Sequence, residues 1–502
     1  IYIYIFECIF DTGGNDVLDL TNITGGTKLD LSGNKVSIIG NDYLIPWVNQ
    51  EGGPTVYGKP QGAPLGIIPG SEIEKVLLPD GASTVTSGSK TTFIVGKANA
   101  VSMADILHYN RTTLRNIQPF YADTNTGGIG VAHNGNLTNA LTLRNELVQQ
   151  GAIFQSTSDT ETILQLVARS KRGRTIDRLI DALFQIQGAY SLVVLTNEKM
   201  IGARDPLGLR PLVLGDLDGS PVLASETCAL DIIGAQFVRD VENGEIVVIN
   251  ENGIESIKPF PQMKPRPCIF EYIYFSRPDS ILLGKSVYNC RKSFGATLAK
   301  ESYVEADVVT PVPDSGVPAA IGFAEHANIP FEMGIIRNHY VGRTFIEPTQ
   351  LGRQLGVKRK HNPNKAHVTG KRVVLIDDSI VRGTTSVKIV QMMREAGATE
   401  VHMRIACPPI THPDFYGIDT PTQDQLLAAT HSMEEMKEYI GADSLAFLTI
   451  DGMYRAMGYE DGRNNDLPQF TDHCFTGDYP TALTDREGDE DFRQLSLLQE
   501  QG

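Results

Sequence analysis

The stretch that decides the fold of this chain reads Val373-Val374-Leu375-Ile376-Asp377-Asp378-Ser379-Ile380-Val381-Arg382-Gly383-Thr384-Thr385. Its four leading apolar residues predict a buried strand, because the run is too short for a helix. Two adjacent carboxylates follow the strand, and a polar loop then leads into a helical pattern from Ser386 to Ala398. Backbone N–H groups and the helix dipole meet at such a helix start. The stretch therefore predicts an anion site between a strand and a helix.

The residue types in the loop suit a phosphorylated sugar. Gly383 allows the backbone to approach a ligand closely, and the hydroxyls of Thr384 and Thr385 can donate to phosphate oxygens. Asp377 and Asp378 suit a pair of sugar hydroxyls or a hydrated divalent cation. The alternative is an ordinary strand–helix turn with a chance Asp-Asp pair, and the flanking pattern favours the anion site.

Composition narrows the possible function classes. The chain has 502 residues, which is enough for two or three domains. Its formal net charge of -16 argues against a general nucleic-acid binder but leaves room for a local basic pocket. No apolar run is long enough to span a membrane, and Ile1 to Phe10 lacks the basic flank of a signal peptide. The six scattered Cys do not form the disulfide framework of a small secreted protein, so a cytoplasmic location is expected.

Changes in amino-acid composition and in the pattern of apolar residues along the chain predict four segments. Residues 1–95 are rich in Gly and Asn and are predicted to form an atypical β segment, for which a foreign or misjoined origin is one interpretation. Residues 96–258 alternate strands with helices, and a Pro-rich linker separates them from residues 268–484. Residues 485–502 read as a polar, mobile tail. Within the first segment, Thr12 to Leu20 resembles one turn of a calcium-binding β-roll. A roll needs stacked repeats, so a turn-rich β segment without a calcium site is expected there.

The segment 268–484 repeats a strand–helix unit. The predicted elements are the strand Ala306–Val312, the helix Val317–Asn328 and the strands Pro330–Ile336, Arg372–Ile376 and Glu400–Ala406. This alternation predicts a parallel α/β sheet with its ligand at the carboxyl ends of the strands.

Several motifs carry a resemblance to known families. The stretch Val373–Thr385 resembles the signature of type I phosphoribosyltransferases, which bind 5-phosphoribosyl-1-pyrophosphate (PRPP). The runs Cys268–Ser280 and Arg337–Ile346 resemble the amidophosphoribosyltransferase family, and the likeness extends over about residues 112–484. It implies an N-terminal-nucleophile glutamine amidotransferase domain (four-layer αββα, incomplete at its start), followed by a type I phosphoribosyltransferase α/β domain. It also implies a transferase that replaces the pyrophosphate of PRPP by ammonia, the first committed step of purine synthesis.

The resemblance assigns roles in the second domain. Asp377 and Asp378 would hold the ribose hydroxyls and Mg²⁺, with Ser315 near the metal. The 5-phosphate would be bound by the loop residues Ser379, Arg382, Gly383, Thr384 and Thr385. Arg343 and the basic residues that follow it would cover the pyrophosphate as a flap. A solvated basic face is the alternative for that run.

In the first domain the resemblance assigns the glutamine site. Asn134 and Gly135 would donate hydrogen bonds to the tetrahedral oxygen, and Asp159 would bind the glutamine amine. A turn at Asn134-Gly135 and a helix N-cap at Ser158 or Asp159 are the structural alternatives.

The nucleophile of this domain departs from the family pattern. The family uses a Cys at the mature N-terminus, and position 1 here is Ile. Cys8 is the candidate nucleophile because it follows Glu7 as in family members made with a propeptide. The residues after it do not match, so a chance Cys is the favoured alternative. The family's Gln-His-Arg-Gly loop is absent as well. The sequence therefore predicts an impaired glutaminase half, with ammonia-dependent transfer retained.

The expected cofactors are Mg²⁺ and, in some family members, a 4Fe-4S cluster on four Cys. Cys268, Cys407 and Cys474 occupy three of the cluster positions, while Thr471 occupies the fourth. An incomplete cluster and three buried thiols are both compatible with this pattern.

The expected partners are PRPP, glutamine or ammonia, inhibitory purine nucleotides and further copies of the chain, with no nucleic acid and no membrane. A non-catalytic PRPP or nucleotide sensor is the alternative function, and a secreted β-roll fusion is a third reading that the lack of repeats disfavours.

Overall fold

The computed structural model describes residues 115–338 and 361–486 with their side chains, and the backbone of nine short strands between residues 17 and 95. The chain divides into two compact units. One comprises residues 1–117 with 155–157, and the other comprises residues 118–154 and 158–502. Cys8 and Arg343 lie outside the described residues.

The first unit contains only strands among its described elements up to residue 95. Their bounds are β1 (Val17–Asp19), β2 (Lys28–Asp30), β3 (Val36–Ile39), β4 (Ile45–Val48), β5 (Pro54–Tyr57), β6 (Ala63–Gly66), β7 (Lys75–Leu78), β8 (Thr84–Thr86) and β9 (Thr92–Val95). The β1, β7 and β9 strands form a parallel sheet, and β2 pairs in parallel with β8. These parallel pairs join strands far apart in the sequence, so simple hairpins do not account for this unit.

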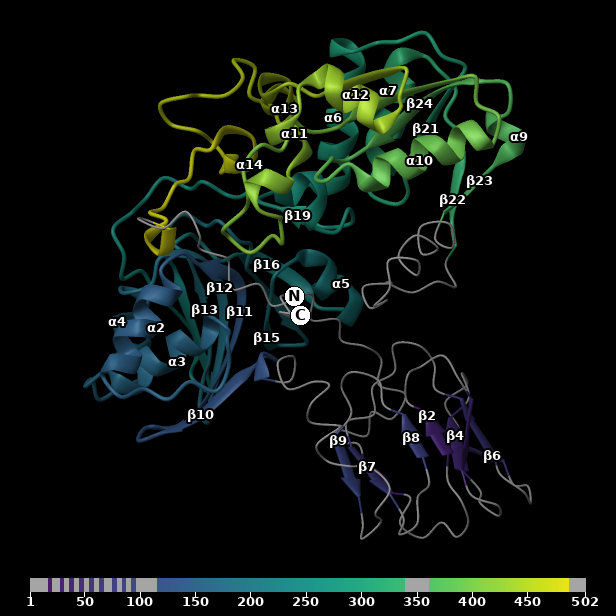
Figure 1. The fold of residues 1–502 in the computed structure, drawn as a ribbon. Helices are drawn as coiled ribbons and strands as arrows, with labels where there is room; N and C mark the ends of the chain where they lie inside the picture. Colours follow the sequence, from purple (N-terminus) through teal and green to yellow (C-terminus); the bar gives the residue numbers. More distant parts are fainter. Residues whose placement is uncertain are drawn as a thin grey trace. The chain divides into compact units, whose positions relative to one another are not determined.

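The second unit begins with two stacked antiparallel sheets (Figure 1). The larger sheet has the order β10 (Phe120–Thr124), β11 (Gly127–Leu137), β12 (Gly188–Thr196), β13 (Met200–Arg204), β17 (Ile246–Asn250) and β18 (Gly253–Ile257). The smaller sheet has the order β15 (Ser220–Ala224), β14 (Val213–Leu217) and β16 (Gln236–Asp240).

Helices cover the two outer faces of this sandwich. The helices on the larger sheet are α2 (Ala140–Gln149), α3 (Thr160–Arg169) and α4 (Thr175–Leu183), and α5 (Thr227–Ile233) lies on the smaller sheet. Ile163 and Leu179 share a buried cluster with the sheet residue Leu192, whereas Leu214 and Val247 pack between the sheets. The order helix, sheet, sheet, helix confirms the predicted αββα layers.

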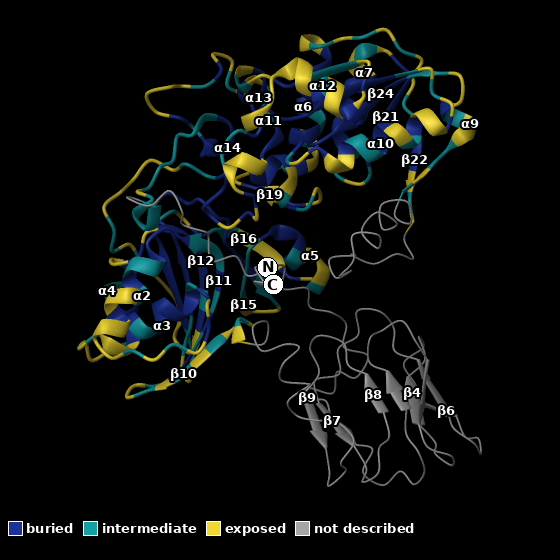
Figure 2. Ribbon diagram, viewed as in Figure 1, coloured by how far each residue is buried: buried dark blue, intermediate teal, exposed yellow. Residues whose placement is uncertain are grey.

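The rest of the second unit is built on a parallel sheet with the order β21 (Val308–Pro311), β24 (Arg372–Asp377), β25 (Glu400–Ile405) and β26 (Ser444–Phe447). Residues 373–376 are fully buried, as expected for a strand covered on both faces (Figure 2). The principal helices are α6 (Val287–Glu301), α7 (Val317–Ala327), α10 (Thr384–Glu395) and α12 (Met433–Ile440).

Short elements complete this half. They are the π-helical turn η1 (Glu271–Phe275), β19 (Ile281–Leu282), β20 (Lys285–Ser286), β22 (Ile335–Arg337), β23 (His361–Pro363), α9 (Lys365–Val368), η2 (Gln423–Gln425), α11 (Leu427–Thr430), α13 (Ile450–Ala456), α14 (His473–Thr476) and η3 (Thr484–Arg486).

One predicted strand, Pro330–Ile336, is mostly wrong. Phe331 makes only an isolated bridge to Val309, and β22 begins at Ile335 and pairs antiparallel with β23 instead of joining the parallel sheet. Pro330 has no N–H to donate, and Gly334 weakens a strand interior, so the ladder is interrupted there.

The carboxylate of Asp485 caps helix α2 from a distant part of the sequence. Its oxygens accept hydrogen bonds from the backbone N–H groups of Leu141 and Thr142, both at 2.8 Å. The N-cap residue Asn139 makes no side-chain capping bond of its own. The predicted start of the tail at residue 485 thus coincides with a residue that is tied to the first half of the unit.

Replacing Asp485 by Ala is expected to lower the free energy of unfolding by about 1–2 kcal/mol, because two N–H groups at the helix start lose their acceptor. Thermal unfolding of the full chain measures the effect. Glu146→Ala, on the exposed face of the same helix, is the control and should change stability by less than about 0.5 kcal/mol. Equal stability of the two variants would show that the cap contributes nothing.

Candidate active site

The predicted phosphate loop joins β24 to α10. Gly383 has a φ of +73° and stands at the N-cap of α10, where a side chain would be strained. A Cβ at this position would also lie 2.7 Å from the Leu427 side chain. Thr384 and Thr385 form the first turn of the helix and are exposed. Their N–H groups and hydroxyls are therefore available to an anion at the helix start.

The two carboxylates at the end of β24 are buried, with Asp377 8% and Asp378 6% exposed. The backbone N–H of Asp378 donates to Asp377 Oδ1 at 3.0 Å, and the Ser379 hydroxyl donates to Asp378 Oδ2 at 2.6 Å. Burial and the charge of Asp378 raise the pKa of Asp377 well above its ordinary value. Within residues 115–338 and 361–486, no Lys or Arg forms an ion pair with either carboxylate. An uncompensated acidic pair of this kind fits a divalent cation.

The loop that contains Ser315 lies at the same edge of the sheet. The N–H of Val312 donates to the carbonyl of Ile376, the residue before Asp377, at 2.8 Å. A Cβ on Gly316 would lie 2.5 Å from that same carbonyl oxygen, so only glycine allows this approach. Ser315 is thereby placed beside the end of β24, next to Asp314, which forms an ion pair with Arg337.

A neighbouring segment braces the phosphate loop. The N–H of Leu427 donates to the Val381 carbonyl at 2.9 Å, and Arg382 Nε donates to Gln425 Oε1 at 3.2 Å. This contact was not predictable from the sequence, because residues 423–430 form only the short turns η2 and α11.

The predicted oxyanion residues lie inside a strand rather than in a turn. Asn134 and Gly135 belong to β11 and pair with Ser191 and Tyr190 of β12. Gly135 has a φ of +145°, and a Cβ there would lie 2.1 Å from the Ala189 carbonyl oxygen. The strand therefore requires glycine at this position.

The sequence did not predict Arg210 as a site residue, but in the structure Arg210 contacts the predicted oxyanion residue Asn134. Residues Arg204–Leu212 form a turn in which the Asp205 carboxylate accepts the N–H groups of Leu207 and Leu209. From this turn Arg210, 1% exposed, donates through Nη2 to Asn134 Oδ1 at 3.1 Å. This bond fixes which end of the Asn134 amide is the acceptor, so Nδ2 is the donating end. One of its two hydrogens is directed to the Ser225 hydroxyl at 3.2 Å, and the second is left to donate. The sequence carries no signal for this contact, because only the structure shows that Arg210 is buried, and a buried Arg is rare unless it is paired.

Asp159 serves the same strand. Its Oδ2 accepts the N–H of Leu137 at 2.9 Å and lies 3.6 Å from His133 Nδ1. Although burial alone would raise the pKa of Asp159, the His133 contact and the hydrogen bonds of Leu137 and Thr160 hold it below its ordinary value. Asp159 stands at the N-cap of α3 but makes no capping bond. The structure thus brings Asp159 to the end of the Asn134–Leu137 segment.

The three thiols proposed for an iron–sulphur cluster are all buried, and burial raises the pKa of each of them. They lie near one another, since Cys268 and Cys407 both contribute to the raised pKa of Cys474. The Thr471 hydroxyl donates to the Arg266 carbonyl at 2.6 Å. A four-iron cluster calls for four thiolates, so these residues do not fit one.

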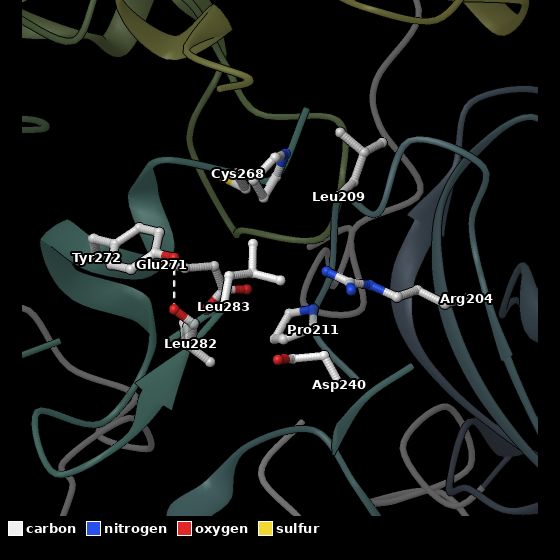
Figure 3. Close-up of a pocket in the computed structure, with 10 residues that line it drawn as sticks. Arg204, Leu209, Pro211, Asp240, Cys268, Glu271, Tyr272, Leu282 and Leu283 are labelled. Atoms are coloured by element: carbon white, nitrogen blue, oxygen red, sulfur yellow. Dashed lines mark hydrogen bonds between the residues drawn. The ribbon is translucent and has the colours of Figure 1, made fainter. Parts of the chain in front are cut away.

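A small cavity lies between the Arg204–Leu212 turn and η1 (Figure 3). Its lining includes Arg204, Asp240, Cys268 and Glu271, and the Tyr272 hydroxyl donates to the Leu282 carbonyl beside it at 3.0 Å. Its volume of about 10 Å³ has room for about one water molecule and no substrate. This cavity is therefore too small to be the substrate site.

Among the described residues, no helix is long and apolar enough to cross a membrane.

The sequence matches two family models, a glutamine amidotransferase domain over residues 107–231 and a phosphoribosyl transferase domain over residues 295–412. Both agree with the halves of the second unit described above.

Individual proteins similar to this chain are named amidophosphoribosyltransferases. An amidophosphoribosyltransferase of Rhizobium etli is 61% identical over 395 residues, which cover 78% of this chain and 79% of that protein. A Bacillus subtilis amidophosphoribosyltransferase is 50% identical over 73% of this chain and 77% of its own length. A chloroplastic one of Arabidopsis thaliana is 52% identical over 77% of this chain and 68% of its own length.

A solved structure agrees with these matches. The glutamine PRPP amidotransferase from B. subtilis, complexed with ADP and GMP, has a TM-score of 0.70 and 49% identity, and the match covers 74% of this chain and 82% of that one. With both domain models matched in order and the phosphate loop in place, the chain belongs to the amidophosphoribosyltransferase family, whose members are pentosyltransferases of the glutamine amidotransferase type.

Proposed function

We propose that this chain forms 5-phosphoribosylamine and pyrophosphate from PRPP and ammonia, with glutamine and water as the ammonia source where the glutaminase half works. The observation that carries the proposal is the buried Asp377-Asp378 pair beside the helix start at Thr384 and Thr385. Ammonia attacks C1 of the sugar, and the C1–O bond to pyrophosphate breaks with its electron pair on the leaving oxygen. The transition state resembles an oxocarbenium ion, so positioning and charge neutralisation suffice.

Each loop has a separate task in this reaction. Thr384, Thr385 and the N–H groups around Gly383 hold the 5-phosphate, together with Ser379 and Arg382. Asp377 and Asp378 hold the ribose hydroxyls and, with Ser315, Mg²⁺. The bound Mg²⁺ would neutralise the charge of the pyrophosphate. Arg343 is proposed to close over the pyrophosphate.

The glutamine site is proposed to lie in the first half of the unit, at the end of β11. Asn134 Nδ2 and the Gly135 N–H are suited to receive a tetrahedral oxygen, because Arg210 fixes the Asn134 amide and Gly135 lies in the strand beside it. Asp159 is proposed to bind the glutamine amine. The nucleophile remains a proposal on Cys8, and the departures from the family motifs before Thr112 support a glutaminase of reduced rate.

Further parts of the proposal concern partners and surroundings. The relative complexed with ADP and GMP supports inhibition by purine nucleotides here, and the family likeness supports a homo-oligomer. Five buried, unpaired Cys in the described part of the chain support a reducing, cytoplasmic location. The Pro-rich stretch after residue 258 is proposed as the boundary between the halves.

Ammonia and glutamine are expected to give different rates. With saturating PRPP and Mg²⁺, formation of phosphoribosylamine from an ammonium salt should exceed formation from glutamine, because only the first reaction bypasses the nucleophile. Trapping of the amine product, or release of pyrophosphate, measures both rates on the full chain. Glutamate release in parallel shows whether the glutaminase turns over at all. A glutamine rate equal to or above the ammonia rate would overturn the impairment.

The sensor alternative is not favoured, since the relatives that cover most of this chain are named as amidophosphoribosyltransferases. It predicts that PRPP binds while neither ammonia nor glutamine supports turnover. Isothermal titration with PRPP and Mg²⁺ beside the rate measurements separates the two functions.

A further inference from the structure

A buried His–Asp pair stands among the three thiols. His473 begins the short helix α14 and has no exposed surface, and Asp414 is also fully buried. His473 Nε2 lies 2.8 Å from Asp414 Oδ2 and 3.4 Å from Cys474 Sγ. An Asp carboxylate buried this deeply requires a compensating partner, and the imidazole supplies it.

The same carboxylate shapes the backbone of the loop 414–418. Asp414 Oδ1 accepts the N–H groups of Tyr416 and Ile418, each at 2.8 Å. The Tyr416 ring packs edge-on against the His473 imidazole, with the ring centroids 5.0 Å apart. One oxygen of Asp414 therefore holds the loop while the other holds His473.

This loop lies against the strand that carries the oxyanion residues. Asn136 Nδ2 donates to the Phe415 carbonyl at 2.9 Å, a bond that joins the two halves of the unit. Gly417 has a φ of +112°, and a Cβ on it would lie 2.9 Å from the carbonyl carbon of Gly135. The loop and the strand thus meet backbone against backbone, and a shift of the loop would be felt at Gly135.

We propose that the direct hydrogen bond between His473 and Asp414, rather than a bound metal, organises the loop 414–418, and through this loop fixes the position of Gly135 and Asn136 in β11. The ligand atoms of Asp414, His473 and Cys474 lie within 4.8 Å of one another, close enough for a metal ion, so the metal content of the chain is part of the test. The pair takes the part that a metal cluster would otherwise have in tying α14 to the segment after Cys407. The importance of Gly135 rests on the proposed glutaminase function, whereas the mechanical link between the pair, the loop and the strand does not.

Hydrogen–deuterium exchange of the full chain tests the link. His473→Gln and Asp414→Asn are expected to raise exchange about tenfold in peptides covering 414–418 and 134–137, because the loop loses the charge-assisted bond that holds it. Peptides from α6 and α7 serve as an internal reference for global unfolding and should keep the wild-type rate.

His402→Gln is the matched control. His402 is also buried, 6% exposed, and its Nε2 lies 3.0 Å from a Glu400 oxygen, but it lies on β25. The control should leave residues 134–137 unchanged. Unchanged exchange at 134–137 in both test variants, or the same change in the control, would overturn the proposal.

Metal analysis of the purified wild-type chain tests whether the loop 414–418 is organised without a metal. Iron, acid-labile sulphide and zinc are all expected to be far below one per chain, even after anaerobic incubation with ferrous iron and sulphide. Stoichiometric metal that is lost in Cys474→Ala would overturn the metal-free reading. Neither measurement uses turnover, so failure of this inference and failure of the proposed enzyme activity are read independently.

Discussion

Replacing both Asp377 and Asp378 by Asn lowers the ammonia-dependent formation of phosphoribosylamine by roughly 100- to 1,000-fold, the loss expected when a charged transition state loses its fixed electrostatic partners. The two side chains lie at the start of the predicted phosphate loop. Among the described residues, no Lys or Arg forms an ion pair with them. With neutral amides in their place, Mg²⁺ and the ribose hydroxyls lose their acceptors. Release of pyrophosphate at saturating ammonia measures the change.

The same variant is expected to be at least as stable as the wild type. Burial and Asp378 raise the pKa of Asp377 in the folded chain. A carboxyl whose pKa is higher folded than unfolded binds protons more readily when folded, so at neutral pH its ionisation opposes folding. The amide removes that cost. Lost activity with an unchanged or higher Tm therefore marks a functional pair, whereas a large fall in Tm would show a structural one.

Asp307→Asn is the control for this variant. Asp307 lies before β21, at the amino end of the same sheet, where it pairs with Arg372 at 2.9 Å. Ligands of parallel sheets bind at the carboxyl ends. Its kcat should match that of the wild type, and an equal loss in the control would contradict the assignment of the site.

Replacing Gly295 by Ala is expected to lower the free energy of unfolding by about 3 kcal/mol through overpacking. Helices α6 and α7 cross with their backbones in contact. A Cβ on Gly295 would lie 1.8 Å from the Ala319 carbonyl oxygen, and one on Gly322 would lie 1.9 Å from the Lys292 carbonyl oxygen. Backbone cannot move aside as a flexible side chain can, so the helices must separate.

Thermal unfolding should show a fall in Tm of roughly 6–12 °C for a change of this size in a domain of a few hundred residues. Gly173→Ala is the matched control, since a Cβ there meets nothing within 4 Å and the residue lies outside the left-handed region. Equal Tm values for the two variants would contradict the close backbone contact between α6 and α7.

The local pattern was enough to predict the strand and the helix on either side of the proposed PRPP site. The fully buried run 373–376 reads as a strand, and the pattern from Ser386 predicts a helix directly after the loop; the helix itself begins two residues earlier, at Thr384. Such signals lie within a few residues of one another, because strand burial and helix capping are set by neighbours in the sequence. The order of the two domains was likewise available from the motifs, and the family matches confirm it.

Short and non-local features were not predictable in this way. The strand expected at Pro330–Ile336 is interrupted by Pro330 and Gly334. Its last residues belong to β22, which pairs antiparallel with β23 instead. Arg210 reads as part of a structural turn, yet its guanidinium reaches Asn134, 76 residues earlier in the chain. Asp485 reads as the start of a tail, yet it caps α2.

The sequence by itself determined that a strand, an acidic pair and a helix start come together, because these residues are consecutive and each conformation is favoured locally. Only the tertiary structure decided which polar groups face one another, as in Arg210 with Asn134 and His473 with Asp414. The physical reason is that a buried polar group must find a partner in three dimensions, and the chain separation of that partner leaves no periodic signal.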